Sequence, residues 1–206
     1  MKLRFSTASV TVILIATLLV SGCQTPSSYE RQVPRHNVTL AEPSHVWAVR
    51  IAKPGLPNFH RVSDDLYRGA QPTAEGFRRL KAMGVKTVID LRFFHNDREK
   101  IAGTELAYEE IPMNTWNVED EDAVRFLILI SDRSRAPFFV HCEHGADRTG
   151  VMSAVYRIVI QGWTKDEAIV EMTEGGFGFH GMWQNLVEYL RNLDPEKLKR
   201  DAFHSR

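Results

Sequence analysis

Cysteine is scarce in this sequence, and the two that occur lie far apart. Only Cys23 and Cys142 are present among 206 residues. We assign them different roles below, which leaves no pair for an internal disulfide framework. The segment around Cys142 also lacks the second cysteine of a metal-ligand pattern. We therefore expect neither a disulfide nor a metal, and no other cofactor is predicted.

An excess of either charge is missing as well. The chain has 26 basic and 26 acidic side chains, so its formal net charge is zero. Proteins that bind nucleic acid need a basic surface, so this balance argues against nucleic acid as a partner. Hydrophobic residues make up 43% of the chain, which is enough for a real core. The length suits one catalytic domain with a short extension.

A third absence is a long hydrophobic run. The apolar stretch from Val10 to Val20 has eleven residues, too few to span a bilayer as a lasting helix. Lys2 and Arg4 precede this stretch. A positive segment followed by a short apolar one is typical of a secretory signal peptide, which we place at residues 1–22.

The signal peptide ends in Val20-Ser21-Gly22-Cys23, which resembles the lipobox of bacterial lipoproteins. In that family the cysteine is lipidated and begins the mature protein, and an Asp after it favours the inner membrane. Gln24 stands there instead, so the resemblance implies an outer-membrane anchor with the protein facing the periplasm. Residues 23–45 are then a polar lipidated tether. The alternative is an ordinary signal peptide or anchor with an incidental cysteine.

The chemistry is expected in the segment from Val140 to Gly150, VHCEHGADRTG. An apolar run, Phe138 to Val140, precedes it, and a helix-compatible run, Val151 to Gln161, follows it. A loop between a buried strand and a helix start presents backbone N–H groups and the positive end of the helix dipole to an anion. Gly145 permits backbone conformations that a side chain would forbid. Arg148 can bind two phosphate oxygens at once.

Cys142 lies in the same field. A thiol at a helix N-terminus beside positive groups favours the thiolate, which is the nucleophilic form. Thr149 can hydrogen-bond the sulfur or a phosphate oxygen. His141 is predicted to order the loop, although a satisfied histidine at a strand end is the simpler alternative. The predicted phosphate-binding residues are Glu143, His144, Gly145, Ala146, Asp147 and Arg148.

A Cys and an Arg separated by five residues, with His before and Thr-Gly after, resemble the signature loop of cysteine-dependent protein tyrosine and dual-specificity phosphatases. Leu66 to Arg92 also resembles the strand–helix–strand opening of the atypical bacterial, fungal and plant members. The resemblance extends from Phe59 to Leu193. It implies hydrolysis of phosphate monoesters through a phosphocysteine, on proteins phosphorylated at Tyr, Ser or Thr. Gln71 and Arg92 are expected to be structural.

The resemblance also implies a general acid on an upstream loop. Where the acid would first be sought, shortly after Pro112, stand Asn114 and Thr115, which cannot serve as the acid. Asp120 is therefore our first candidate and Glu119 the second. For both, an acidic helix N-terminus that complements the helix dipole is the alternative.

Asp147 is a third candidate, inside the loop. An Asp directly before the Arg resembles the loop of the myotubularin and Sac-type phosphoinositide phosphatases. Phosphorylated lipids or small molecules such as inositol phosphates therefore stay open as alternative substrates. A different functional class also stays open, namely a lipoprotein that binds phosphate groups without catalysis. Sulfur transfer of the rhodanese type is disfavoured by the Arg-Thr-Gly ending.

Strands that alternate with helices predict an α/β domain with a central, mostly parallel sheet flanked by helices. The loop lies at the carboxyl end of a strand, where such sheets bind ligands. We place the phosphatase domain at residues 46–195 and a solvated polar tail at 196–206. Thr73 and Thr164 are predicted helix N-caps, the second in a capping box with Glu167.

Overall fold

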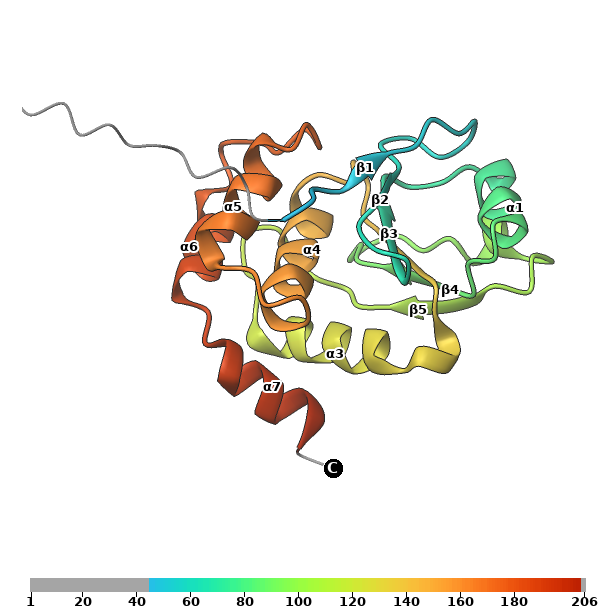
Figure 1. The fold of residues 1–206 in the computed structure, drawn as a ribbon. Coiled ribbons are helices and arrows are strands. Elements are labelled where there is room, and N and C mark those ends of the chain that lie inside the picture. Colours follow the sequence, from blue (N-terminus) through green and yellow to red (C-terminus); the bar gives the residue numbers. More distant parts are fainter. Residues whose placement is uncertain (1–44, 205–206) are drawn as a thin grey trace, which may run out of the picture. The chain divides into compact units, whose positions relative to one another are not determined.

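The computed structural model describes residues 45–204. The predicted signal peptide, Cys23 and nearly all of the predicted tether lie outside the described residues. Among the residues that are described, no helix combines the length and the apolar character that a membrane span requires. These residues form an α/β unit in which helices flank one sheet (Figure 1), so the predicted fold class is confirmed.

The sheet has six strands in the spatial order β1-β2-β3-β6-β4-β5. The first two pairings are antiparallel, and β3, β6, β4 and β5 run parallel to one another. The strands are β1 Val49–Arg50, β2 His60–Arg61, β3 Leu66–Gly69, β4 Thr87–Asp90, β5 Ala107–Glu110 and β6 Phe138–His141. The strand that leads into the predicted phosphate loop is therefore β6, which lies between β3 and β4 within the sheet.

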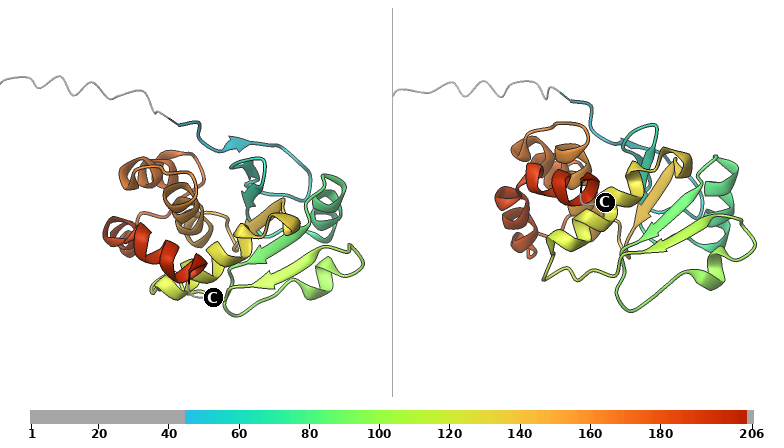
Figure 2. Two further views of the ribbon diagram at one scale, coloured as in Figure 1. Left: turned by 60° about the horizontal axis from the view of Figure 1, so that its bottom comes forward. Right: turned by 90° about the horizontal axis from the view of Figure 1, so that it is seen from below.

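Helices cover both faces of the sheet. Helices α1 and α2 lie on one face, and α3 to α7 gather on the other (Figure 2). The helices are α1 Ala74–Ala82, α2 Arg98–Ile101, α3 Asp120–Ser131, α4 Asp147–Val159, α5 Lys165–Glu174, α6 Gln184–Asn192 and α7 Pro195–Phe203, with a 3-10 turn at Arg133–Arg135.

Two hydrophobic cores follow from the alternation of side chains along the strands. On β4, Val88 packs into the core beneath α1, and the next residue, Ile89, packs into the larger core on the opposite face. On β6, Phe139 belongs to the first core and Val140 to the second. All four side chains are fully buried. Packing on both faces fixes β6 in place and therefore positions the loop that follows it.

The predicted helix starts are confirmed by their capping contacts. The Thr73 side chain accepts a hydrogen bond from the backbone N–H of Gly76 at the start of α1. Thr164 and Glu167 form the predicted capping box on α5. Such caps satisfy N–H groups that have no partner within the helix.

Residues 195–203 form helix α7, where the sequence suggests a solvated tail. The Asp194 side chain caps the helix by accepting from the N–H groups of Glu196 and Lys197, and Pro195 takes the first position. Leu198 and Ala202, four residues apart, are buried, and α7 packs against α3. Two small apolar anchors among charged neighbours are enough for this packing, although they give a weak pattern in the sequence.

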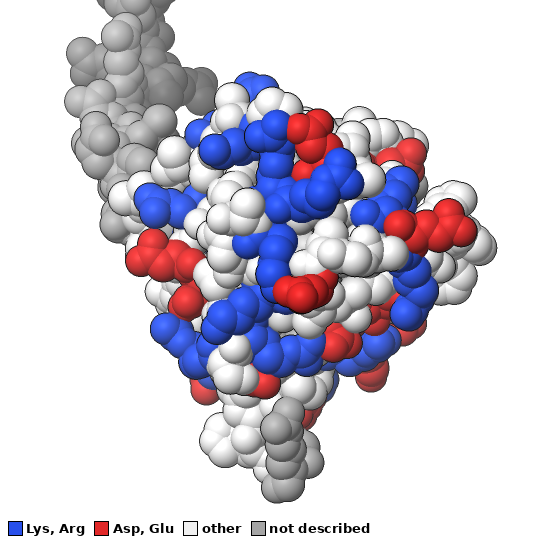
Figure 3. Space-filling model, turned by 90° about the vertical axis from the view of Figure 1, so that its right-hand side faces the viewer, with Lys and Arg blue, Asp and Glu red and all other residues white. Residues whose placement is uncertain are grey.

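The face at the right-hand side of Figure 1, where α1 lies, carries basic side chains interleaved with acidic ones (Figure 3). The pairs made by α1 include Arg79 with Glu75 and Lys81 with Glu105. Exposed pairs of this kind contribute little to stability. The ion pairs that support the site are instead buried ones, which Arg92 makes with Asp90 and Asp97.

Candidate active site

The loop from Cys142 to Ala146 connects β6 to α4 and curls so tightly that it needs a glycine. Gly145 has φ 69°, in the left-handed region. A Cβ at this position would lie 2.3 Å from the carbonyl carbon of Gly69, at the end of β3. Cys142 is 2% exposed and is not in a disulfide. The loop thus sits against β3 with its thiol enclosed.

A buried arginine holds the loop from behind. Arg68, on β3, is 1% exposed and donates a hydrogen bond from Nη2 to the carbonyl of Gly145 at 2.9 Å. Its guanidinium also lies over the ring of Phe177, 3.9 Å from the ring centre. In a trans peptide the N–H points opposite to the C=O, so this contact turns the N–H of Ala146 away from Arg68. Arg68 therefore sets the direction of a loop donor.

The charge of Arg68 also acts on the site. Burial lowers the pKa of Arg68 to about 10, and the charges of Glu171 and Cys142 oppose this shift. At neutral pH the side chain is therefore a buried cation near the sulfur. The sequence reasoning missed this residue. The signal available was an arginine in the middle of the otherwise apolar strand β3.

Two side chains next to the thiol serve the loop in different ways. The Nδ1 atom of His141 lies 3.2 Å from the carbonyl oxygen of Cys142, so this ring contacts the loop backbone. Thr149, in the first turn of α4, is fully buried, and its Oγ1 has no hydrogen-bond partner among residues 45–204. Buried hydroxyls normally have a partner, and the sulfur or an incoming phosphate oxygen would provide one.

A buried network of ion pairs supports the other side of the loop. Arg92 donates to Oδ1 and Oδ2 of Asp90 at 3.0 and 2.8 Å, and to Oδ2 of Asp97 at 2.7 Å. Gln71 donates from Nε2 to Oδ1 of Asp97 at 2.7 Å, and its backbone N–H donates to the carbonyl of Glu143 at 3.1 Å. The network therefore reaches the residue after Cys142. These contacts match the structural roles expected for Gln71 and Arg92.

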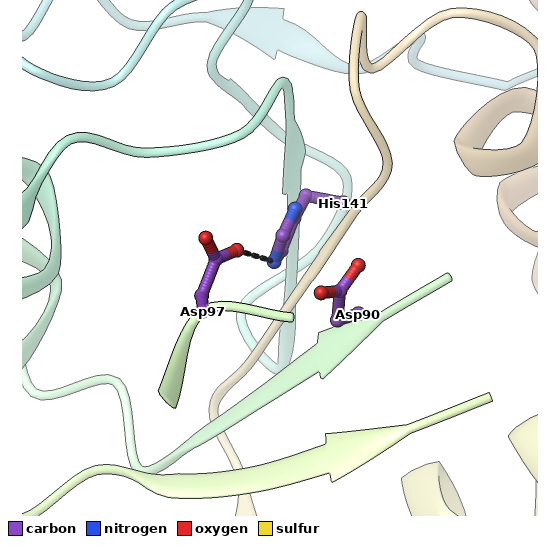
Figure 4. Close-up of side chains that lie close together, drawn as sticks. All are labelled: Asp90, Asp97 and His141. Carbon is purple, nitrogen blue, oxygen red and sulfur yellow. Dashed lines mark ion pairs between the residues drawn. The ribbon is translucent and has the colours of Figure 1, made fainter. Parts of the chain in front are cut away.

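Asp90, Asp97 and His141 come close enough together to resemble a metal-binding set (Figure 4). The distance from Nε2 of His141 to Oδ2 of Asp97 is 3.5 Å, at the limit of a hydrogen bond. Burial lowers the pKa of His141, so its ring is neutral at pH 7. Burial alone would raise the pKa of Asp90, but hydrogen bonds led by those from Arg92 bring it below its ordinary value. The guanidinium of Arg92 already supplies the cation that these carboxylates require.

A pocket of about 220 Å³ opens beside Arg148 and Glu143. Three large apolar side chains on its wall are exposed, namely Phe93 at 48%, Phe94 at 77% and Trp116 at 62%. The remaining wall residues are Arg92, His95, Asn114 and Thr115. The site thus joins an anion-binding loop to a partly aromatic rim.

Comparisons with known proteins agree with this geometry. The family model described as DSP-PTPase phosphatase fused to NAD+ kinase matches residues 53–188. The dual specificity protein phosphatase TpbA of Pseudomonas aeruginosa strain UCBPP-PA14 is 34% identical over 168 residues, which cover 81% of this chain and 76% of TpbA. This chain belongs to the dual-specificity phosphatase family. It is therefore a cysteine-dependent hydrolase of phosphate esters, as the loop predicts.

Solved structures of TpbA share the fold of this phosphatase. The crystal structure of P. aeruginosa TpbA has a TM-score of 0.69 at 33% identity and covers 78% of this chain and 99% of that chain. A cysteine-to-serine variant of TpbA in complex with pTyr has a TM-score of 0.68 at 32% identity and covers 77% of this chain and 97% of that chain. The predicted phosphatase fold is confirmed by these likenesses.

The first two general-acid candidates of this phosphatase have structural partners. The carboxylate of Asp120 accepts from Tyr189 at 3.3 Å and from Lys197 at 2.8 Å, which ties α3 to α6 and α7. Glu119 is the N-cap of α3 and forms a capping box with Asp122. These contacts fit the helix-terminus alternative, and the role of either residue as the acid stays a prediction.

The third candidate, Asp147, has a different kind of partner. Both of its carboxylate oxygens accept hydrogen bonds from His180, which lies between α5 and α6. Sequence reasoning did not single out His180, which is 33 residues further along the chain. The only local signal was the glycine-rich stretch before it, at residues 175–178.

Proposed function

We propose that this phosphatase acts on phosphorylated proteins, with phosphotyrosine as the preferred ester, through a phosphocysteine on Cys142. The observation that carries the proposal is the buried Cys142 on the loop between β6 and α4, which Arg68 holds at the Gly145 carbonyl and which Arg148 follows in the first turn of α4. The pTyr complex of a TpbA variant supports the choice of ester. Exposed aromatic side chains on the pocket wall suit a phosphotyrosine ring better than a short alkyl side chain.

The chemistry follows from these positions in two steps. In the first, the sulfur of Cys142 attacks phosphorus and the bond to the ester oxygen breaks. Arg148 and the loop N–H groups hold the oxygens on which negative charge develops. In the second, water attacks phosphorus, the S–P bond breaks, and inorganic phosphate leaves.

Steady-state hydrolysis of p-nitrophenyl phosphate tests the activity. Wild type should turn over, and Cys142→Ser should not, because a hydroxyl is not activated in the same way. Binding of phosphate or vanadate without any turnover by wild type would favour the non-catalytic phosphate-binding alternative. Equal turnover by both proteins would refute Cys142 as the nucleophile.

A comparison of phosphopeptides tests the preferred ester. Aromatic pairs contribute about 0.5–1.5 kcal/mol, so Trp116→Ala should raise the KM for a phosphotyrosine peptide by about 2–10-fold. The KM for the matched phosphoserine peptide should not change. A wild type that prefers the phosphoserine peptide would contradict the proposal.

We also propose that the protein is a lipoprotein of the bacterial cell envelope, held through lipidated Cys23, with the outer membrane as the expected site and the domain facing the periplasm. The lipobox-like sequence and Gln24 support this proposal. Mass spectrometry of the mature protein should find acyl groups on Cys23. A mature protein that still begins at Met1 would refute the anchor and leave the phosphatase proposal untouched.

A further inference from the structure

Asp147 has both of its carboxylate oxygens committed to one residue. Oδ1 accepts from the backbone N–H of His180 at 2.9 Å, and Oδ2 accepts from its Nδ1 at 2.8 Å. The Asp147 side chain is 9% exposed, whereas that of His180 is 49% exposed. The carboxylate is therefore shielded, while the imidazole that it holds is open to solvent.

These contacts determine which nitrogen of His180 is available. Nδ1 carries the hydrogen that is donated to Asp147, so Nε2 is the nitrogen that can exchange a proton with a substrate or water. This atom has no hydrogen-bond partner among residues 45–204. An imidazole oriented by a carboxylate on one nitrogen and free on the other is the arrangement that proton transfer requires.

The ring of His180 is held beside the phosphate loop. It meets the ring of His144, two residues after Cys142, at a centroid distance of 5.6 Å and an interplanar angle of 71°. The segment before His180 is fastened to the loop as well, because Nδ2 of Asn58 donates to the carbonyls of His144 at 2.9 Å and Phe177 at 2.8 Å. The ring thus contacts the loop at His144 and the first residue of α4 at Asp147.

The pocket next to Arg148 offers few proton donors on its own wall, and His180 lies beside the phosphate loop rather than on that wall. Asn114 and Thr115 lie on its wall, where the resemblance places a carboxylic acid. Among the residues that line this pocket, Glu143 and His95 are the candidate proton donors, and no carboxylate among residues 45–204 hydrogen-bonds His95. An alkoxide leaving group nevertheless needs a proton.

We propose that His180 is the general acid of the first step and the general base of the second, with Asp147 as its positioning residue; this rests on the proposed function. In the first step the S–P bond forms, the P–O bond breaks, and the ester oxygen takes the proton from Nε2. In the second step Nε2 takes a proton from the attacking water while the P–S bond breaks. The thiolate and the imidazolium are both restored.

A series of esters with increasingly poor leaving groups tests the assignment. On p-nitrophenyl phosphate, whose leaving group needs no proton, the loss of kcat/KM by His180→Asn should be the smallest of the series. On phenyl phosphate the variant should lose activity, and on an alkyl phosphate the loss should reach about 10²-fold or more. Asp147→Asn should lose less, with the same dependence on the leaving group. His144→Asn is the control, a neighbouring imidazole that should show no such dependence.

Two results would overturn the assignment. One is a loss by His180→Asn that is equal for all esters, which would indicate a structural role. The other is a selective loss in His95→Asn, Glu143→Gln, Asp120→Asn or Glu119→Gln with none in His180→Asn. His180→Gln serves in the same assay if His180→Asn does not fold. A wild type that hydrolyses no ester refutes the proposed function itself, whereas an active wild type with no selective loss in either His180 variant refutes only the acid.

Discussion

Replacing Gly145 by alanine should disable the loop through backbone geometry alone. The left-handed backbone at φ 69° costs a residue with a Cβ about 1–2 kcal/mol. The new Cβ would lie 2.3 Å from the carbonyl carbon of Gly69, 2.4 Å from its oxygen and 2.5 Å from the nitrogen of Ala70. All three are backbone atoms of the turn in which β3 ends, at Gly69 and Ala70, so no side chain can rotate away to relieve the contact.

The loop and this turn must therefore separate by roughly 1 Å, and a displacement of that size costs about 10²-fold in rate. Overpacking adds about 1–3 kcal/mol, so the free energy of unfolding should fall by about 2–5 kcal/mol in total. The assay is kcat/KM on p-nitrophenyl phosphate for Gly145→Ala, together with urea unfolding.

Gly84→Ala is the matched control. Gly84 has φ 87°, and a Cβ there would meet nothing within 4 Å. This variant should lose about 1–2 kcal/mol of stability and no activity. If Gly145→Ala kept the kcat/KM of Gly84→Ala, the fit of the loop against β3 could not be what positions its donors.

Three further predictions concern charge. Arg148→Lys should lower kcat/KM by about 10²-fold or more, because an ammonium cannot bind two phosphate oxygens in the fork geometry, and kinetics equal to wild type would contradict this role. Glu171 accepts from Nε and Nη2 of buried Arg157 at 2.7 and 2.6 Å. Glu171→Gln should therefore lower the free energy of unfolding, measured by urea titration, by about 3–5 kcal/mol. A loss no larger than that of the exposed control Glu75→Gln would refute this. Burial lowers the pKa of His60 and His141, so below about pH 6.5 the unfolded chain binds more protons than the folded one. The free energy of unfolding should therefore fall between about pH 6.5 and about pH 5. A value that does not change with pH in urea titrations would contradict this prediction.

The parts of the structure that depend on neighbouring residues could be predicted from the sequence. The apolar run before Cys142 and the helix-compatible run after it identify the strand–loop–helix, because strands and helices have their own periods. Thr73 and Thr164 mark helix starts, since a capping side chain contacts N–H groups within three residues.

The support of the loop could not be predicted, because it comes from residues far apart in the chain. Arg68 meets Gly145 across 77 positions, and His180 meets Asp147 across 33. No local pattern encodes such pairs: the order of strands brings Arg68 to Gly145, and the packing of the helices after β6 brings His180 to Asp147. Helix α7 was not predicted for another reason: its charged residues outnumber its two buried apolar residues, Leu198 and Ala202.

The most direct test of the nucleophile is the capture of the phosphoenzyme. Wild type mixed with an aryl phosphate and quenched in acid within one turnover should carry one phosphoryl group on the peptide that contains Cys142, as measured by mass spectrometry. Cys142→Ser should carry none under the same conditions. Turnover by wild type with Cys142 unmodified at every quench time, or with the phosphoryl group on another residue, would contradict the mechanism.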